Sequence, residues 1–303
     1  MQSRSLAAFA AVACYFVLSQ ASLAQDASPD GRVITQEIVL NDPTQANGGG
    51  WHFNIGAEVW GAYFPSIPFI VLGKPGSASF GGIVEGGDAA ISRGNWTLLL
   101  GYRPGQFTGN FTSSAGAEKQ TSNTTEYEAR VRYLLRDSDW LGFTPYLIAG
   151  FDHLDWRQHY NLTSDPSLPP QDLGNLESDV QYWNTVEAGF GGMHPFGPGW
   201  GMRIDGTLGV GNGHLDGHYL GVFATNKFIN NNPWSISGTG LAGNVYLTIY
   251  DHITDNLVAN IGARFAGESA SGPTGSNAPG TTTTFSASWL GAYASLSYSF
   301  DTP

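Results

Sequence analysis

The feature that most constrains this chain is a period of two in its apolar residues, repeated in segment after segment from Trp51 to Phe300. Between residues 125 and 135, apolar side chains at odd positions alternate with charged side chains at even positions, which are Glu126, Glu128, Arg130 and Arg132. Successive side chains of a β-strand point to opposite faces, so each such segment has one apolar and one polar face. The pattern predicts an all-β protein.

Ten segments carry the pattern. They are Trp51 to Phe64, Ala78 to Ser92, Asn95 to Phe107, Thr125 to Leu135, Thr144 to Trp156, Ser178 to Met193, Trp200 to His214, Ser237 to Asp251, Asn256 to Gly267, and Phe285 to Phe300. The connections between them alternate strictly: 93–94, 136–143, 194–199 and 252–255 are short, and the other five are long. Short turns at one end and long loops at the other, with an even strand count, are typical of a transmembrane β-barrel. We therefore predict a transmembrane antiparallel up-and-down β-barrel of about ten strands, with apolar faces toward lipid and polar faces toward the lumen.

Aromatic residues near the segment ends agree with this fold, because interfacial girdles of Trp and Tyr flank the lipid-facing band of such barrels. We expect such positions at Trp51, Tyr63, Trp96, Tyr146, Tyr182, Trp200, Tyr250 and Trp289. The last segment alternates apolar residues with serine and ends on Phe300, three residues before the C-terminus. This ending resembles the C-terminal signal of Gram-negative outer-membrane proteins, although Asp301, Thr302 and Pro303 follow the aromatic residue. Over residues 51 to 300 the chain is similar to the porin-like and small-barrel class.

The first residues are typical of an export signal. Arg4 precedes an apolar run from Leu6 to Leu18, and small residues at 22–24 predict cleavage near Ala24. We expect residues 1–24 to be a signal peptide, residues 25–50 a flexible periplasmic arm, and residues 51–303 an outer-membrane barrel. The only cysteine, Cys14, lies inside the signal, so the mature chain would have no disulfide, cysteine nucleophile or thiolate ligand.

The composition excludes several function classes. The formal net charge is −12 with only 13 basic residues, so we expect no nucleic-acid partner, since phosphates require clustered Lys and Arg. The sequence has no Gly-x-Ser-x-Gly elbow, phosphate loop or His-Glu-x-x-His motif, and we expect no cofactor and no metal ion. The expected partners are outer-membrane lipid, lipopolysaccharide and the barrel-insertion machinery, with a surface ligand that the sequence does not identify.

The alternation places five acidic and five basic side chains in the lumen. They are Glu58, Arg103, Glu126, Glu128, Arg130, Arg132, Glu187, Arg203, Asp205 and Arg264. Barrels of about eight strands are filled by side chains, whereas open channels have about sixteen or more strands. The favoured interpretation is a salt-bridged packing of the lumen; a narrow, gated passage for small solutes through the same mixed charges is the other. Between these two, the sequence does not decide.

A second candidate site is Asp216-Gly217-His218, after the seventh segment. Residues two apart on a strand share a face, so Asp216 would orient His218 as a general base. The motif resembles the catalytic Asp-x-His of omptin proteases, which are ten-stranded outer-membrane barrels. That resemblance implies Asp216 as the orienting acid and His218 as the base. Omptins also use two aspartates from the second loop region, but residues 104–124 contain no aspartate and only one carboxylate, Glu118.

Three functions follow from these patterns. The leading hypothesis is a non-enzymatic outer-membrane barrel with a charged, largely packed lumen and a surface structural, adhesion or small-solute passage role. The enzymatic alternative is an omptin-like surface endopeptidase. The third is a soluble exported β-protein that binds carbohydrate through its Trp and Tyr residues. Whatever the barrel presents at the surface would depend on its long loops, whose specificity composition does not encode.

Overall fold

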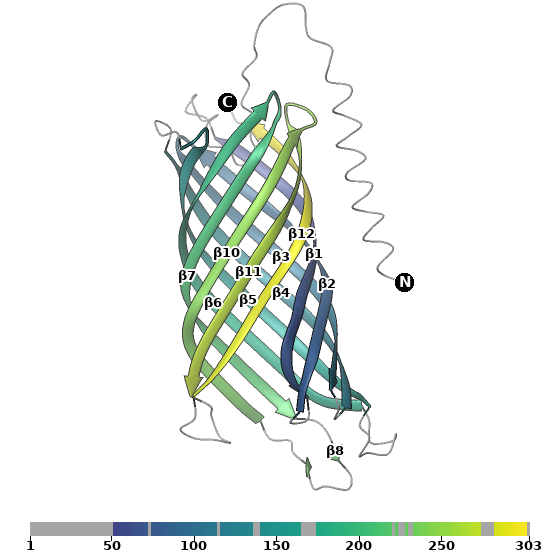
Figure 1. Ribbon diagram of the computed structural model, residues 1–303. Coiled ribbons are helices and arrows are strands. Elements are labelled where there is room, and N and C mark those ends of the chain that lie inside the picture. The colour runs from purple at the N-terminus through teal and green to yellow at the C-terminus, as the bar shows by residue number, and fades with distance from the viewer. Residues whose placement is uncertain are drawn as a thin grey trace, which may run out of the picture. The chain divides into compact units, whose positions relative to one another are not determined.

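A computed structural model of the chain describes residues 51–71, 74–113, 116–135, 140–164, 174–219, 222–223, 228–229, 233–273 and 282–301. The predicted export signal and arm lie outside these residues. Ten long strands form the barrel drawn in Figure 1. They are β1 (His52–Val71), β2 (Lys74–Arg93), β3 (Trp96–Ser113), β4 (Gly116–Leu134), β5 (Thr144–Ser164), β6 (Gly174–Gly197), β7 (Trp200–Tyr219), β10 (Pro233–His252), β11 (Leu257–Pro273) and β12 (Thr282–Asp301). Two short strands, β8 (Val222–Phe223) and β9 (Phe228–Ile229), pair with each other in the connection between β7 and β10.

The sheet closes on itself, which confirms the predicted fold. Each long strand pairs antiparallel with its neighbours in chain order, and β1 pairs with β12, from His52 opposite Asp301 to Tyr63 opposite Leu290. We call the end that carries the β2–β3, β4–β5, β6–β7 and β10–β11 turns the short-turn end; it lies uppermost in Figure 1. We call the other end the long-connection end. The predicted strict alternation of short and long connections is wrong, because β1 and β2, and likewise β3 and β4, extend until only residues 72–73 and 114–115 separate them. Closure leaves no free strand edge, as a membrane span requires.

All ten predicted strands exist, but they are longer than predicted at the long-connection end. β4 begins at Gly116 rather than Thr125, and β7 runs to Tyr219 rather than His214. The strands have 17 to 24 residues, whereas a bilayer needs about 9–11 residues of tilted strand. The residues added to β4 from Lys119 to Thr124 are polar on both faces, whereas those added to β1 from Pro65 to Val71 are mostly apolar. Neither stretch shows the apolar alternation that marks a strand in the sequence.

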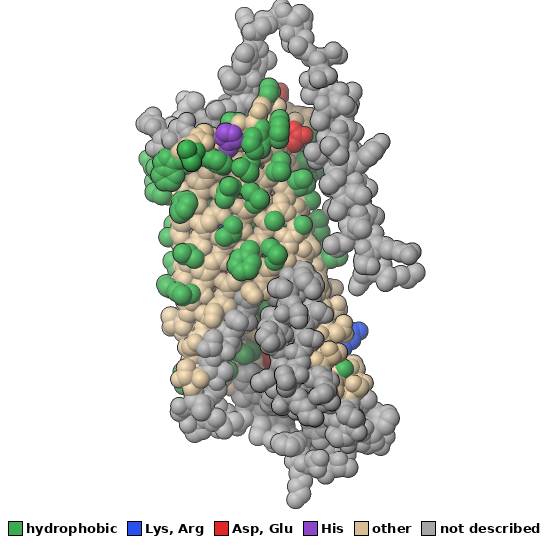
Figure 2. All heavy atoms as spheres, viewed as in Figure 1, with side chains coloured by type: hydrophobic (Ala, Val, Ile, Leu, Met, Phe, Trp, Pro, Cys, Tyr) green, Lys and Arg blue, Asp and Glu red, His purple; other side chains and the backbone are tan. Residues whose placement is uncertain are grey.

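The two faces of the wall differ as the alternation predicts. Along β4, buried and more exposed residues alternate without a break. Large apolar side chains point outward and are exposed, among them Leu208 at 79%, Leu241 at 71% and Phe190 at 63%. Such a surface is suited to lipid. In Figure 2, hydrophobic side chains spread over the visible wall toward the short-turn end.

Three residues assigned to the aromatic girdle lie on the inward face instead, and one of them is Tyr250, which is opposite the inward Asn260 in the β10–β11 pair. Trp51, Trp96 and Trp200 are exposed near the short-turn end, but Tyr146 is 1% exposed and Trp289 is 6% exposed, both inside the lumen. The reason is parity: Tyr146 shares a face with the inward Ile148, and Trp289 shares one with the inward Ser297. Position near a strand end therefore did not suffice to assign a girdle residue.

The short turns depend on glycines in the left-handed region. Gly94, Gly142 and Gly199 have φ of 61°, 84° and 83°, a backbone conformation that costs most side chains energy. They lie in the β2–β3, β4–β5 and β6–β7 turns. Within the part of the chain that the structure describes, no helix is long and apolar enough to cross a membrane.

Candidate functional site: the charged lumen

The structure places all ten predicted lumen charges inside the barrel and joins them into two ionic clusters. The first, the central cluster, begins at Arg103 on β3. Its guanidinium contacts Glu58 on β1 through Nε and Glu128 on β4 through NH1, the latter at 2.6 Å. Arg130 contacts the other oxygen of Glu128 at 2.9 Å and reaches Glu187 on β6 at 3.4 Å.

Arg264 on β11 completes the central cluster from the opposite wall. It holds Glu126 in a two-pronged ion pair, with NH1 at 2.7 Å from Oε2 and NH2 against Oε1. Asn244 links this pair to the rest, because its amide donates to Glu187 at 2.6 Å and accepts from Arg264 at 3.1 Å. Strands far apart in the sequence are thus joined through the lumen. Two-pronged Arg–carboxylate pairs are among the strongest charge-assisted hydrogen bonds.

The second cluster, the basal cluster, lies closer to the short-turn end. Asp205 on β7 accepts from Arg132 at 2.7 Å and from the Tyr146 hydroxyl, and Arg203 lies at 3.5 Å. The guanidinium of Arg132 also lies over the Tyr146 ring, 5.3 Å from its centroid. Space for this packing comes from a glycine: a Cβ on Gly191 would lie 2.5 Å from both Asp205 and Tyr146.

The lumen holds more acid than the sequence pattern indicates, so the expected balance of five charges of each sign is wrong. Three further carboxylates face the central part of the lumen, namely Asp88, Asp152 and Glu268. Two more, Glu118 and Asp179, are buried nearer the long-connection end. Among the described residues the inward arginines remain five, so the carboxylates are in excess.

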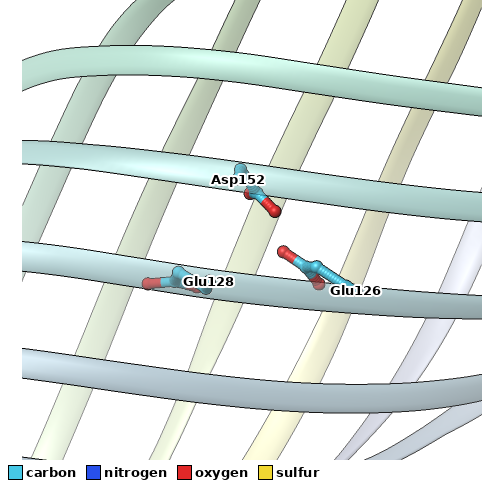
Figure 3. A group of neighbouring side chains, drawn as sticks. All are labelled: Glu126, Glu128 and Asp152. Atoms are coloured by element: carbon cyan, nitrogen blue, oxygen red, sulfur yellow. The ribbon is translucent and has the colours of Figure 1, made fainter.

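Asp152 shows the consequence of this excess. Its carboxylate oxygen and those of Glu126 and Glu128 lie within 4.8 Å of one another, and Figure 3 shows Asp152 and Glu126 pointing toward each other. Oxygens at such separations suit a hard cation such as Ca²⁺, which binds at about 2.3–2.6 Å. Glu126 and Glu128 are already paired with arginines, whereas Asp152 is 5% exposed and its Oδ1 has no hydrogen-bond partner among the described residues.

Apolar layers cover the ionic clusters on both sides. Toward the long-connection end, Trp60, Trp156, Trp183, Trp289 and Phe107 pack with seven smaller apolar residues into one buried group, the aromatic layer. Its rings lie close, with Trp289 6.1 Å from both Trp60 and Trp156 between centroids. Toward the short-turn end, a smaller group comprises Leu134, Tyr146, Ile148 and Met193. The lumen is therefore packed in three layers.

Two of the small cavities within this packing lie beside the ionic clusters. The larger, about 60 Å³, lies beside Glu58, Asp88 and Arg103 and has room for a few water molecules. The smaller, about 10 Å³, lies beside Asp152, Glu126 and Glu268 and has room for about one. Both are lined by charged groups, which is where ordered water is expected.

The predicted omptin-like pair is described only in part. Asp216 is exposed on the outward face of β7, and its Oδ2 lies 2.9 Å from Nε2 of His214. His218 lies on β7 opposite Pro233, and its side chain is outside the described residues. Glu118, the only carboxylate of residues 104–124, is buried on the inward face of β4.

Sequence reasoning missed several lumen residues for identifiable reasons. Asp152 shares parity with the inward Tyr146 and Ile148, so counting by two along that strand would have found it. Glu268 lies one residue beyond the predicted end of its strand, and Asp88 lies in a glycine-rich segment with weak alternation. Asn244 carries no charge, and only the register of β10 with β7 and β11 brings it to the arginines.

Comparison with known proteins finds similar structures but no similar sequence. No protein-family model matches the chain, and no curated protein matches it. The translocator domain of the autotransporter NalP from Neisseria meningitidis is similar at 12% identity, covering 84% of this chain and 90% of that chain, with a TM-score of 0.45. The outer membrane protease OmpT from Escherichia coli is similar at 10% identity, with coverages of 83% and 97% and a TM-score of 0.47.

The β domain of the Bordetella autotransporter BrkA is similar at 12% identity, with coverages of 81% and 98% and a TM-score of 0.40. At these identities the likeness concerns the fold alone. The chain is an all-β protein of ten antiparallel up-and-down strands in a closed ring, similar to outer-membrane β-barrels.

Proposed function

We propose that this protein is an outer-membrane β-barrel with a closed lumen that serves a surface structural or adhesive role. Its exposed outward leucines, valines and phenylalanines support a lipid environment, since water would not favour such a band. In this proposal its lateral partners are outer-membrane lipid and lipopolysaccharide. The export signal at residues 1–24 supplies the route to that membrane.

The single observation that carries the closed lumen is its three-layer packing. The central and basal ionic clusters span the interior from wall to wall, and the aromatic layer covers them with buried Trp60, Trp156 and Trp183 at 2–4% exposure. A solute that crossed would have to displace both the ion pairs and the rings. Ten strands also lie near the size at which side chains fill a barrel.

The surface role rests on the length of the strands. Because they have 17 to 24 residues, roughly half of each strand extends beyond the part needed to cross a bilayer. On the β4 extension both faces are polar, with Gln120 and Ser122 inside and Thr121 and Asn123 outside. A rigid polar wall that rises from the membrane is suited to present the long connections to other cells or surfaces.

Planar-bilayer conductance tests the closed lumen. The refolded protein is expected to give no steady conductance, and the double variant Trp156→Ala/Trp289→Ala is expected to give intermittent currents because it opens the aromatic layer. The single variant Leu208→Ala is the control, since that side chain faces outward. Steady conductance from the unmodified protein would contradict the proposal.

Small-solute passage is the second candidate, and the cavity beside Glu58, Asp88 and Arg103 favours it. A polar cavity at mid-lumen is where a narrow path would widen. Liposome swelling in solutions of small sugars and amino acids tests it: solute-dependent swelling would support passage, and its absence would support the closed lumen.

The omptin-like peptidase has less support, because Asp216 faces outward beside His214 and Glu118 is buried. A peptidase assay on the His218→Ala variant tests that alternative.

A further inference from the structure

Three polar side chains form a hydrogen-bonded chain on the outer wall of the barrel, near the long-connection end. Ser237 on β10 has its hydroxyl oxygen 2.5 Å from Nδ1 of His214 on β7. Nε2 of the same ring lies 2.9 Å from Oδ2 of Asp216, two residues further along β7. The order hydroxyl, imidazole, carboxylate is the arrangement that activates a serine in unrelated hydrolases.

Strand register explains how these residues meet. Ser237 and His214 are directly opposite each other in the β7–β10 pair, where Cβ atoms are about 4.5–5.5 Å apart. Asp216 shares the outward face with His214 because the two are separated by one inward residue, Leu215, which is 7% exposed. The site therefore needs no loop to assemble it and is held by the rigid wall.

The position of the site on the wall indicates what it would meet. Four residues toward the short-turn end on each strand, Val210 and Leu241 are exposed apolar side chains at 60% and 71%. Four residues of tilted strand separate them from the site by about 10 Å along the barrel axis. A lipid whose acyl chains lie against Val210 and Leu241 would bring its ester linkages close to Ser237.

We propose that Ser237, His214 and Asp216 form a serine-hydrolase centre that cleaves acyl esters of membrane lipids on the outer wall of the barrel. This activity goes beyond the structural role and is independent of whether the lumen conducts. It also assigns Asp216 to His214, not to the omptin-like pair.

The reaction follows from the geometry. In the reacting tautomer, the Nε2–H of His214 donates a hydrogen bond to the Asp216 carboxylate, and Nδ1 carries no proton. Nδ1 therefore accepts the Ser237 hydroxyl proton as Oγ attacks the ester carbonyl carbon. The carbon–oxygen bond of the ester breaks, and the departing alcohol oxygen takes the proton from Nδ1. Water then attacks the acyl-serine and gives a proton to Nδ1, and that proton returns to Ser237 as the fatty acid leaves. Each proton that moves starts and ends on a named atom.

Asn212 is placed to stabilise the oxyanion of this reaction. It lies two residues before His214 on the same outward face and opposite Thr239. The Asn212 Oδ1 accepts a hydrogen bond from the Thr239 hydroxyl at 3.1 Å, so the amide nitrogen Nδ2 points away from Thr239. Among the described residues, Nδ2 has no hydrogen-bond partner. A side-chain amide can serve as an oxyanion donor.

Labelling with a fluorophosphonate probe tests the nucleophile on the full-length protein refolded in detergent. The unmodified barrel and the Ser269→Ala variant, which removes an exposed serine from the same wall, are expected to be labelled. Ser237→Ala is expected to lose labelling entirely. A heat-dependent shift in SDS electrophoresis shows that each variant is folded, and absence of labelling in the folded unmodified barrel, or labelling that persists in Ser237→Ala, overturns the proposal.

Hydrolysis of a fluorescent-acyl phospholipid in mixed micelles tests the substrate class. His214→Gln is expected to lower the rate by about a hundredfold or more, the usual contribution of a general base. Asn212→Ala is expected to lower it by about 10²–10³-fold, because the Asn212 amide binds the oxyanion. Asp216→Asn is expected to lower it by about 10⁴-fold, because the Asp216 carboxylate orients the base. Cleavage of a soluble short-chain ester without cleavage of the phospholipid, or cleavage of a peptide alone, overturns the lipid-ester assignment.

Discussion

The central and basal clusters occupy the same lumen, yet they balance their charges differently. In the basal cluster, one carboxylate, Asp205, is shared by Arg132 and Arg203. In the central cluster, three arginines are surrounded by Glu58, Glu126, Glu128, Asp152, Glu187 and Glu268. Residue type alone therefore does not determine how much a buried charged side chain stabilises the barrel. The loss of stability depends on whether removing that side chain leaves an oppositely charged neighbour buried without another ion-pair partner.

Arg264→Met is expected to have the largest effect. It would leave Glu126 buried without its two-pronged partner in a region already rich in carboxylates, and breaking a buried pair costs about 3–5 kcal/mol. Arg203→Met in the basal cluster is the matched comparison, since Arg203 makes one contact at 3.5 Å and Asp205 keeps Arg132. Denaturant unfolding in detergent should show a clearly smaller loss for Arg203→Met. Equal losses would mean that the two clusters do not differ in how removal of one arginine leaves its carboxylate compensated.

Gly191→Ala is expected to rank second, and it tests the basal cluster through packing instead of charge. The added methyl would lie 2.5 Å from Asp205 and the Tyr146 ring, and overpacking of this kind costs about 1–3 kcal/mol. Gly206→Ala is the control, because the nearest atom to a Cβ there is 4.0 Å away. The unfolding midpoint should fall for Gly191→Ala and stay unchanged for Gly206→Ala. If both fall alike, strand flexibility and not lumen space explains these glycines.

Asp152→Asn is expected to act in the opposite direction. Asp152 lies beside Glu126 and Glu128 with Oδ1 unbonded among the described residues, so a neutral side chain of the same shape removes repulsion. We expect a gain of about 1 kcal/mol in unfolding free energy, the order of one improved hydrogen-bonding environment. The control is Asp205→Asn, which should destabilise because Arg132 and Tyr146 depend on that carboxylate. A loss of stability in Asp152→Asn would show that this carboxylate has a stabilising partner, such as a bound cation.

These comparisons also show how far the sequence determines the structure. Alternation is a local signal, so it located every long strand and placed Arg103, Arg130 and Arg264 inside. Pairing across the lumen is not local. Glu126 meets Arg264 at a sequence separation of 138 only because the ring closes, and nothing in either segment indicates its partner. The same holds for Ser237 and His214, whose meeting depends on strand register.

Arg157→Gln is expected to have the smallest effect and completes the comparison of inner and outer charges. Arg157 pairs with Asp155 at 3.2 Å on the outer wall, but its side chain is 67% exposed. Water already solvates both groups there, and such surface pairs contribute little to stability. We therefore expect no measurable change in the unfolding midpoint of Arg157→Gln at physiological salt. Arg264→Met is expected to lose stability, although both substitutions remove the arginine of an arginine–carboxylate pair. A substantial loss in Arg157→Gln would place the outer wall in a less solvated environment, as lipid headgroups would provide, and would shift the membrane boundary toward the long-connection end.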